Sequence, residues 1–247
     1  MAIALRSLLL RTPDPDFLEI RHGNVDLQVA LRRRPTARRL TLRVSNATGE
    51  VIMTVPSRTS LATAQKFAVS HSGWIVARLA KVPARMPFEV GAGIPLRGEA
   101  HRIAHRAGRG ACAVERIDGE PVIVVTGDSA HVSRRVRDFL QREVRRDLTA
   151  ASEVYAARLG ERPRRITVRD TRSRWGSCTA SGELNFSWRL ILAPPVVLDY
   201  LVAHEMAHLR EMNHSARFWS LVGSVCPHVD EAERWLKRHG AELHRYG

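Results

Sequence analysis

Two histidines and a glutamate with the spacing of a metal site are the residues of this sequence best suited to chemistry. His204, Glu205 and His208 form the pattern H-E-x-x-H within the segment LDYLVAHEMAHL. Residues four apart leave a helix on the same face, so one helix would bring both imidazoles together. The flanking residues are mostly apolar, and unpaired histidines would be costly in a buried helix. The spacing therefore predicts a metal site.

The chemistry that this pattern indicates is hydrolysis by a zinc enzyme. Neutral imidazole suits Zn²⁺, and catalytic zinc sites use three protein ligands and leave a fourth position for water or substrate. Glu205 directly follows the first histidine, and a carboxylate there can take a proton from water whose pKa the metal has lowered. We expect Zn²⁺ as the cofactor, His204 and His208 as ligands, and Glu205 as the catalytic base.

A third ligand must come from outside this pattern. His214 lies six residues after His208 and is the nearest donor once the helix has ended and the chain has turned. Metzincins share this spacing but have a glycine midway, where this chain has Glu211, so the sequence does not match their pattern. Other donors further along the chain are a carboxylate on a following helix, as in thermolysin-like enzymes, or a histidine: Glu231, Glu233 and His228.

The segment RWGSC is a second candidate for a functional element. Its Arg174 and Trp175 could hold an anionic or planar group of a substrate, and Gly176 could permit a close approach of the backbone. The alternative is a structural role, in which Trp175 packs in the core and Arg174 braces the fold. The serine and cysteine that follow are not expected to act as nucleophiles, because a metal-activated water makes one unnecessary.

An α+β fold is expected to position these residues. Between residues 25 and 56, alternating apolar and polar residues predict antiparallel strands with at least one hairpin, whose turn contains Asn46 and Gly49. Gly-rich connections and the β-branched run VIVVT predict a second group of strands from Pro87 to Thr126. Between the two groups of strands, Thr59–Leu79 has helical spacing and forms one helix or two that break near Gly73. Residues 1–128 are thus predicted to form a β-rich region with one helical segment.

The second half, residues 129–247, is predicted to hold the chemistry. An amphipathic helix over His131–Leu159 opens it, and strands follow at RRITVRD, RWGSC and ELNFSW. Pro194 and Pro195 suit the start of the helix that carries the two histidines, because proline is tolerated in a first turn. Two shorter helices are expected at Ser215–Val225 and Asp230–Arg238.

Composition limits the class of protein. The 247 residues are 44% hydrophobic, enough for a sizeable core, and 39 Lys and Arg against 25 Asp and Glu give a net charge of +14. This charge favours anionic partners without identifying one. Three cysteines do not suit a paired disulfide framework, and the apolar N-terminal run is interrupted by Arg6 and too short to span a bilayer. We expect a cytoplasmic protein with a frayed N-terminus and no membrane association.

Several segments together resemble the YgjP-like metallopeptidase family. They are RWGSC, the HEMAHL helix and NHSARFW, and upstream RRRPTARRLTLRV, GEVIMTVP and SGWIVARL, so the likeness covers most of residues 30–240. The helix and NHSARFW are also similar, more distantly, to SprT-like proteases, in which a histidine of a second helix completes the zinc site. The resemblance implies a minimal zincin-type catalytic half, with zinc on His204, His208 and His214 and catalysis by Glu205. Asn213, which opens NHSARFW, joins Arg174 and Trp175 as a candidate for substrate binding.

Three functions follow from these observations. A metallopeptidase would need a groove beside a strand to hold a peptide. A nucleoside triphosphate pyrophosphatase acting on UTP, an activity also attributed to the family, would need arginines that converge on the metal. A DNA-associated protease is a third reading, based on the net charge and the SprT-like resemblance, although the chain has no recognised DNA-reading motif. The oligomeric state does not follow from the sequence.

Overall fold

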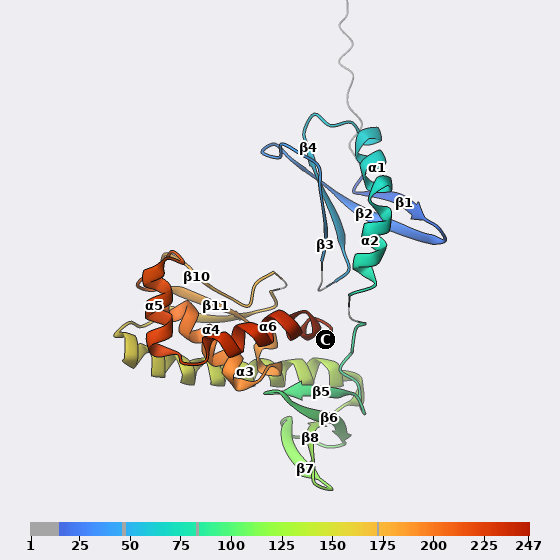
Figure 1. Ribbon diagram of the computed structural model, residues 1–247. Coiled ribbons are helices and arrows are strands. Elements are labelled where there is room, and N and C mark those ends of the chain that lie inside the picture. Colours follow the sequence, from blue (N-terminus) through green and yellow to red (C-terminus); the bar gives the residue numbers. More distant parts are fainter. Residues whose placement is uncertain (1–14, 46–47, 83, 172) are drawn as a thin grey trace, which may run out of the picture. The chain divides into compact units, whose positions relative to one another are not determined.

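The chain combines a β-rich N-terminal half with mostly helical elements after it, in a mixed α+β arrangement (Figure 1). The structure is a computed structural model that describes residues 15–247 except 46, 47, 83 and 172. It divides into two compact units, Met1–Val82 and Pro83–Gly247. The sequence had placed the division near residue 128. The observed division lies earlier because the strands of residues 93–126 share one hydrophobic core with the helix that follows them.

The described residues of the first unit form one four-stranded sheet and two helices. Its elements are β1 (Phe17–His22), β2 (Val25–Arg34), β3 (Thr41–Val44), β4 (Val51–Pro56), α1 (Leu61–Ser70) and α2 (Ser72–Leu79). The strand order is β1-β2-β4-β3. The predicted hairpin is confirmed, because β3 and β4 pair antiparallel, whereas its expected turn residue Asn46 lies outside the described residues. The expectation of antiparallel pairing throughout is wrong for β2 and β4, which run parallel, because alternation fixes which face of a strand is buried and not its direction.

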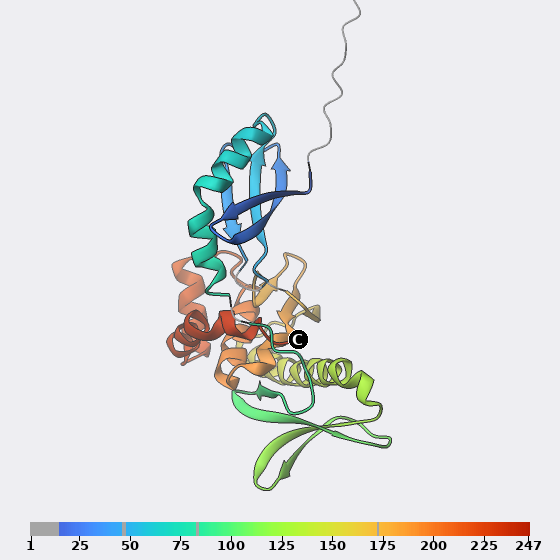
Figure 2. The same cartoon turned by 90° about the vertical axis from the view of Figure 1, so that its right-hand side faces the viewer.

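Alternating residues of the central strands bury one face of this sheet under the two helices. The side chains of β2 and β4 in this core are Leu27, Val29, Leu31, Val51, Met53 and Val55. Figure 2 shows α1 and α2 following one another along the sheet. The side chain of Ser60 caps α1 by accepting the N–H of Thr63, and the helical segment breaks at His71, two residues before the predicted Gly73.

In the second unit, the part that the structure describes forms two small sheets and four α-helices. The first sheet has the order β5-β6-β8-β7 and the second the order β10-β11-β9. The strands are β5 (Gly93–Leu96), β6 (Glu99–Arg106), β7 (Ala113–Ile117), β8 (Glu120–Thr126), β9 (Arg165–Arg169), β10 (Gly176–Cys178) and β11 (Glu183–Ser187). The α-helices are α3 (Val132–Leu159), α4 (Pro195–Ala207), α5 (Ala216–Val225) and α6 (Val229–Leu243), and two 3₁₀ helices are η1 (Ser129–His131) and η2 (Trp188–Leu192).

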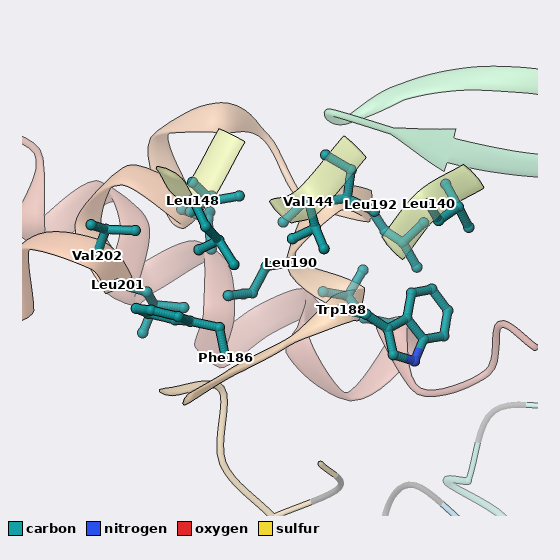
Figure 3. Packing of buried hydrophobic residues seen from close by; sticks show 14 of the residues in the cluster. Leu140, Val144, Leu148, Phe186, Trp188, Leu190, Leu192, Leu201 and Val202 are labelled. Carbon is teal, nitrogen blue, oxygen red and sulfur yellow. The ribbon is translucent and has the colours of Figure 1, made fainter. Parts of the chain in front are cut away.

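The long helix α3 forms one side of the core of this unit. Its buried stripe recurs every three or four residues, as the sequence predicted for an amphipathic helix. Leu140, Val144 and Leu148 project from α3 toward side chains of β11, η2 and α4 (Figure 3). These partners are Phe186, Trp188, Leu190, Leu192, Leu201 and Val202. The core thus fixes α4, the helix with the H-E-x-x-H pattern, against α3. Within the described part of the chain, no helix has the length and apolarity needed to cross a membrane.

Candidate metal centre

Helix α4 brings the first two histidines to one place. Pro195 occupies its first turn, as the sequence predicted, and His204 and Glu205 lie in its last turn. His208 is the residue directly after the helix and keeps helical backbone angles, with φ −64° and ψ −16°. The ring centroids of His204 and His208 are therefore 5.0 Å apart. Most residues of α4 are buried, so the histidines belong to a helix with little freedom to move.

His214 joins them from the turn between α4 and α5. It precedes Ser215, whose hydroxyl caps α5 by accepting the N–H of Phe218. The Nε2 atom of His214 lies 3.0 Å from Nε2 of His204, and its ring centroid lies 4.7 Å from that of His208. The buried ring of Phe218 stacks on His208 with the centroids 4.4 Å apart, which limits rotation of that imidazole.

The three imidazoles fit a zinc ion. One ring nitrogen from each of His204, His208 and His214 lies within 4.8 Å of the others, and three nitrogen donors are a set that catalytic zinc takes. Burial, aided by the two neighbouring histidines, lowers the pKa of His204 to about 4. Burial also lowers the pKa of His208, with the carbonyl of Glu211 acting in the opposite direction. Imidazoles that stay neutral at pH 7 are free to coordinate a metal.

Contacts behind the histidines orient their rings. His208 Nδ1 donates to the carbonyl oxygen of Glu211 at 3.0 Å, which leaves Nε2 for the metal. His204 Nδ1 lies 3.4 Å from the hydroxyl of Tyr200, which donates to a carboxylate oxygen of Glu233 at 2.7 Å. Burial and this hydrogen bond raise the pKa of Tyr200. Such outer contacts fix the tautomer and direction of metal-binding imidazoles.

The alternative third ligands lie elsewhere. The exposed Glu233 is engaged with Tyr200, and Glu231 is exposed in the first turn of α6. His228 gathers instead with Asp199 and Cys226, in a second cluster of possible ligands. Among the described residues, none of these three side chains belongs to the group formed by the histidines of α4 and the following turn.

Glu205 lies against the backbone of β10. Its side chain is only 5% exposed. A Cβ atom added to Gly176 would lie 2.8 Å from Glu205 Cγ and 2.9 Å from Cδ, so the strand can pass this close only with glycine. Burial raises the pKa of Glu205 to about 7, although the charge of Arg174 acts in the opposite direction. The site thus holds a carboxyl group whose pKa is close to neutrality, which suits a general base.

Two adjoining cavities open on this carboxylate, and both are lined by Gly176, His204 and Glu205. The larger, of about 800 Å³, is also lined by Trp175, Tyr200, Leu201, Asp230, Glu233, Arg234, Leu236 and Lys237. The smaller, of about 320 Å³, is also lined by Arg174, Ser177, Cys178, His208, Met212 and His214. All three residues of β10 thus border the cavities, and β10 pairs with β11 on one side as an edge strand of its sheet.

The three candidate substrate-binding residues differ in whether they line a cavity. Arg174 is exposed and lines the smaller cavity. Trp175 lines the larger cavity and stacks on His244, with the ring centroids 4.8 Å apart. Asn213 is exposed and lines neither cavity. Sequence reasoning missed Tyr200, although its position four residues before His204 is the spacing that puts two residues on one helix face.

Comparisons with known proteins identify the family of the chain. No curated protein matches the chain. A crystal structure titled as the metallopeptidase zymogen of Pyrococcus abyssi abylysin matches 38% of this chain and 93% of its own, with 22% identity and a TM-score of 0.33. The model of the YgjP-like, metallopeptidase domain family matches residues 38–239. Because that match spans most of the sequence, the chain belongs to the YgjP-like metallopeptidase family.

Proposed function

We propose that this protein is a zinc-dependent peptidase in which Glu205 acts as the general base. The observation that carries the proposal is the groove beside β10. Its residues, Gly176–Cys178, form an edge strand, and the cavities run along it past Glu205 and His204. An extended peptide can pair with such an edge through main-chain hydrogen bonds, which would place a scissile bond beside the carboxylate.

His204, His208 and His214 would hold the zinc ion. When bound there, zinc supplies Lewis acidity, which polarises a carbonyl group and lowers the pKa of water. Glu205 accepts a proton from the attacking water at its carboxylate and donates it to the leaving amine. The close contact with the β10 backbone holds the carboxylate in place, and burial raises its pKa, which favours uptake of the proton.

The polar groups in the larger cavity favour a peptide over a nucleoside triphosphate. A UTP pyrophosphatase needs cationic groups that converge on the phosphates. Arg234 and Lys237 line this cavity, but Asp230 and Glu233 line it as well and offset their charge. Arg174 is the arginine that borders the smaller cavity. This balance supports an uncharged main chain as the substrate.

Zinc analysis with paired activity assays tests the proposal. Wild type and Glu205→Gln are assayed on casein and on UTP, after the zinc content of both proteins is measured. The proposal expects peptide cleavage by wild type, a loss of roughly 10²–10⁴-fold in the variant, and equal zinc in both. Glu205-dependent release of pyrophosphate without peptide cleavage would instead assign a nucleotide hydrolase, and full activity of the variant would remove Glu205 as the base.

A DNA-associated protease is distinguished by the salt dependence of binding. The net charge of +14 is compatible with nucleic acid, and phosphate contacts impose a steep fall in affinity as salt increases. Binding to duplex DNA that falls steeply between 50 and 200 mM salt, with peptide cleavage stimulated by DNA, would favour that function. Absent or salt-insensitive binding leaves the peptidase without a DNA partner.

A further inference from the structure

A second cluster of metal-ligand side chains lies outside the histidine centre. Asp199 belongs to α4, whereas Cys226 and His228 belong to the turn that connects α5 to α6. One possible ligand atom from each, a carboxylate oxygen, a thiol sulfur and an imidazole nitrogen, lies within 4.8 Å of the other two. The cluster therefore joins α4 to the turn after α5. Its two members nearest in sequence across this gap, Asp199 and Cys226, are 27 residues apart.

The donors of this cluster are tightly gathered. His228 Nε2 lies 2.7 Å from Asp199 Oδ2, but this contact does not have the geometry of a hydrogen bond. Among the described residues, this buried nitrogen therefore has no hydrogen-bond partner. Cys226 is 1% exposed, and the side chains of Asp199 and His228 are 34% and 26% exposed. A comparably short distance, 3.0 Å, separates Nε2 of His204 from Nε2 of His214 in the histidine centre.

The types of donor select a particular class of cation. A thiolate, an imidazole and a carboxylate are together the ligands that Zn²⁺ takes in proteins, whereas Mg²⁺ and Ca²⁺ prefer oxygen donors alone. We propose that Asp199, Cys226 and His228 form a second zinc site, separate from the histidine centre. A water molecule is available for the fourth position, while the hydroxyl of Tyr155 donates to Asp199 Oδ2 at 2.6 Å and so orients that carboxylate.

The environment of the cysteine is consistent with this assignment. Burial raises the pKa of the Cys226 thiol, while the N–H of His228 and the hydroxyl of Tyr155 act in the opposite direction. The buried thiol binds zinc as a thiolate, so loading the site releases its proton. Asp199 also lines a cavity of about 260 Å³, bordered by α3, α4 and η2, to which Cys226 and His228 do not contribute.

Zinc at this position would cross-link α4 to the turn between α5 and α6. Asp199 lies five residues before His204, and both α5 and α6 pack against α4. The bound ion therefore stabilises the packing of the three helices around the histidine centre. Ligand binding to the folded state alone raises stability, so this ion contributes to thermal stability independently of catalysis.

The stoichiometry of zinc in purified full-length protein tests the proposal. Wild type is expected to hold about two zinc ions per chain, and both His204→Ala/His208→Ala and Cys226→Ser/His228→Asn are expected to hold about one. A His204→Ala/His208→Ala protein that is folded by circular dichroism but holds no zinc would overturn the proposal. Unchanged zinc in Cys226→Ser/His228→Asn would overturn it equally, because these donors would then be only a packing contact.

Cobalt substitution gives a readout that is specific to the sulfur ligand. A thiolate bound to Co²⁺ produces intense near-ultraviolet charge-transfer absorption that imidazole and carboxylate ligands do not. Metal-free protein titrated with Co²⁺ is expected to show this band, to lose it with Cys226→Ser, and to keep it with Cys178→Ser, the matched control at the edge of the histidine centre. Absence of the band in wild type, or its loss only with Cys178→Ser, would contradict the second site.

Discussion

Gly176 and Glu205 approach each other so closely that a methyl group on the glycine would lie 2.8 Å from Glu205 Cγ. The contact joins β10, an edge strand, to α4, the helix that carries two of the candidate ligands. At this point β10 contributes only backbone atoms, which cannot shift as the end of a flexible side chain can. The carboxylate of Glu205 is therefore the group that must move when a side chain is added at Gly176. The strand that borders the groove therefore also positions the proposed base.

Gly176→Ala tests this relationship. We expect the added methyl to displace the carboxylate of Glu205 and to reduce kcat/KM by about 10²-fold, the cost of a misplacement near 1 Å. Zinc content should be unchanged, because the three atoms nearest to the added methyl all belong to Glu205 and not to the histidines. Peptidase assays and zinc analysis measure the two effects.

Gly223→Ala is the matched control for that variant. Gly223 lies in α5, and a Cβ atom there would meet nothing within 4 Å. Alanine in a helix is favoured over glycine by roughly 0.5–1 kcal/mol, so this variant should keep full activity and unfold at the same or a higher temperature. Equal activity of Gly176→Ala and Gly223→Ala would show that the β10 contact does not position Glu205.

His214→Ala tests the choice of the third ligand. Loss of one of three proposed ligands should weaken zinc binding by more than the 10–100-fold typical of an outer-shell partner. Chelator competition measures the affinity. Glu231→Gln is the control, because its exposed carboxylate lies outside the histidine group, and it should bind zinc as wild type does. Zinc affinity that falls for Glu231→Gln and not for His214→Ala would move the ligand to α6.

Tyr200→Phe tests the contact behind His204. The hydroxyl lies 3.4 Å from His204 Nδ1 and is held by Glu233 at 2.7 Å, so its removal frees the imidazole to rotate. We expect zinc affinity to fall by roughly 10–100-fold. Tyr246→Phe removes a hydroxyl outside this group of residues and should leave the affinity unchanged. If both variants bind zinc equally, Tyr200 serves packing alone.

Local patterns in the sequence predicted the helices better than the sheets. The observed α3 begins one residue after the predicted His131 and ends at the predicted Leu159, because its apolar stripe and its left-handed Gly160 are both local signals. The parallel pairing of β2 with β4 was missed, since pairing direction depends on the path of the chain between strands. The end of α6 was also missed: the helix continues to Leu243, five residues beyond the predicted Arg238.

The same distinction applies to the candidate site. Spacing along one helix predicted that His204 and His208 share a face, and His214 followed from a short turn. The contact of Gly176 with Glu205 and the contact of Tyr200 with Glu233 join elements that are distant in sequence. Neither contact follows from propensity or periodicity, because each depends on how β10 and α6 pack against α4. The sequence could nominate Gly176 for a close approach of the backbone but could not name its neighbour.

Truncation tests where the chain can be divided. The second unit, Pro83–Gly247, has its own core, to which the sheet of β5–β8 contributes buried apolar side chains. These include Ile94, Leu96, Ile103, Ile123 and Val125. Burial of each is worth roughly 1.5–3 kcal/mol, so together they are comparable with the roughly 5–15 kcal/mol by which a typical domain is stable. A protein of residues 83–247 should therefore fold cooperatively and bind zinc, whereas residues 129–247 should not.

Thermal unfolding and zinc analysis of the two fragments measure this difference. Equal zinc binding by both fragments would place the boundary near residue 128 after all, and would mean that α3 does not need the sheet beside it to hold α4.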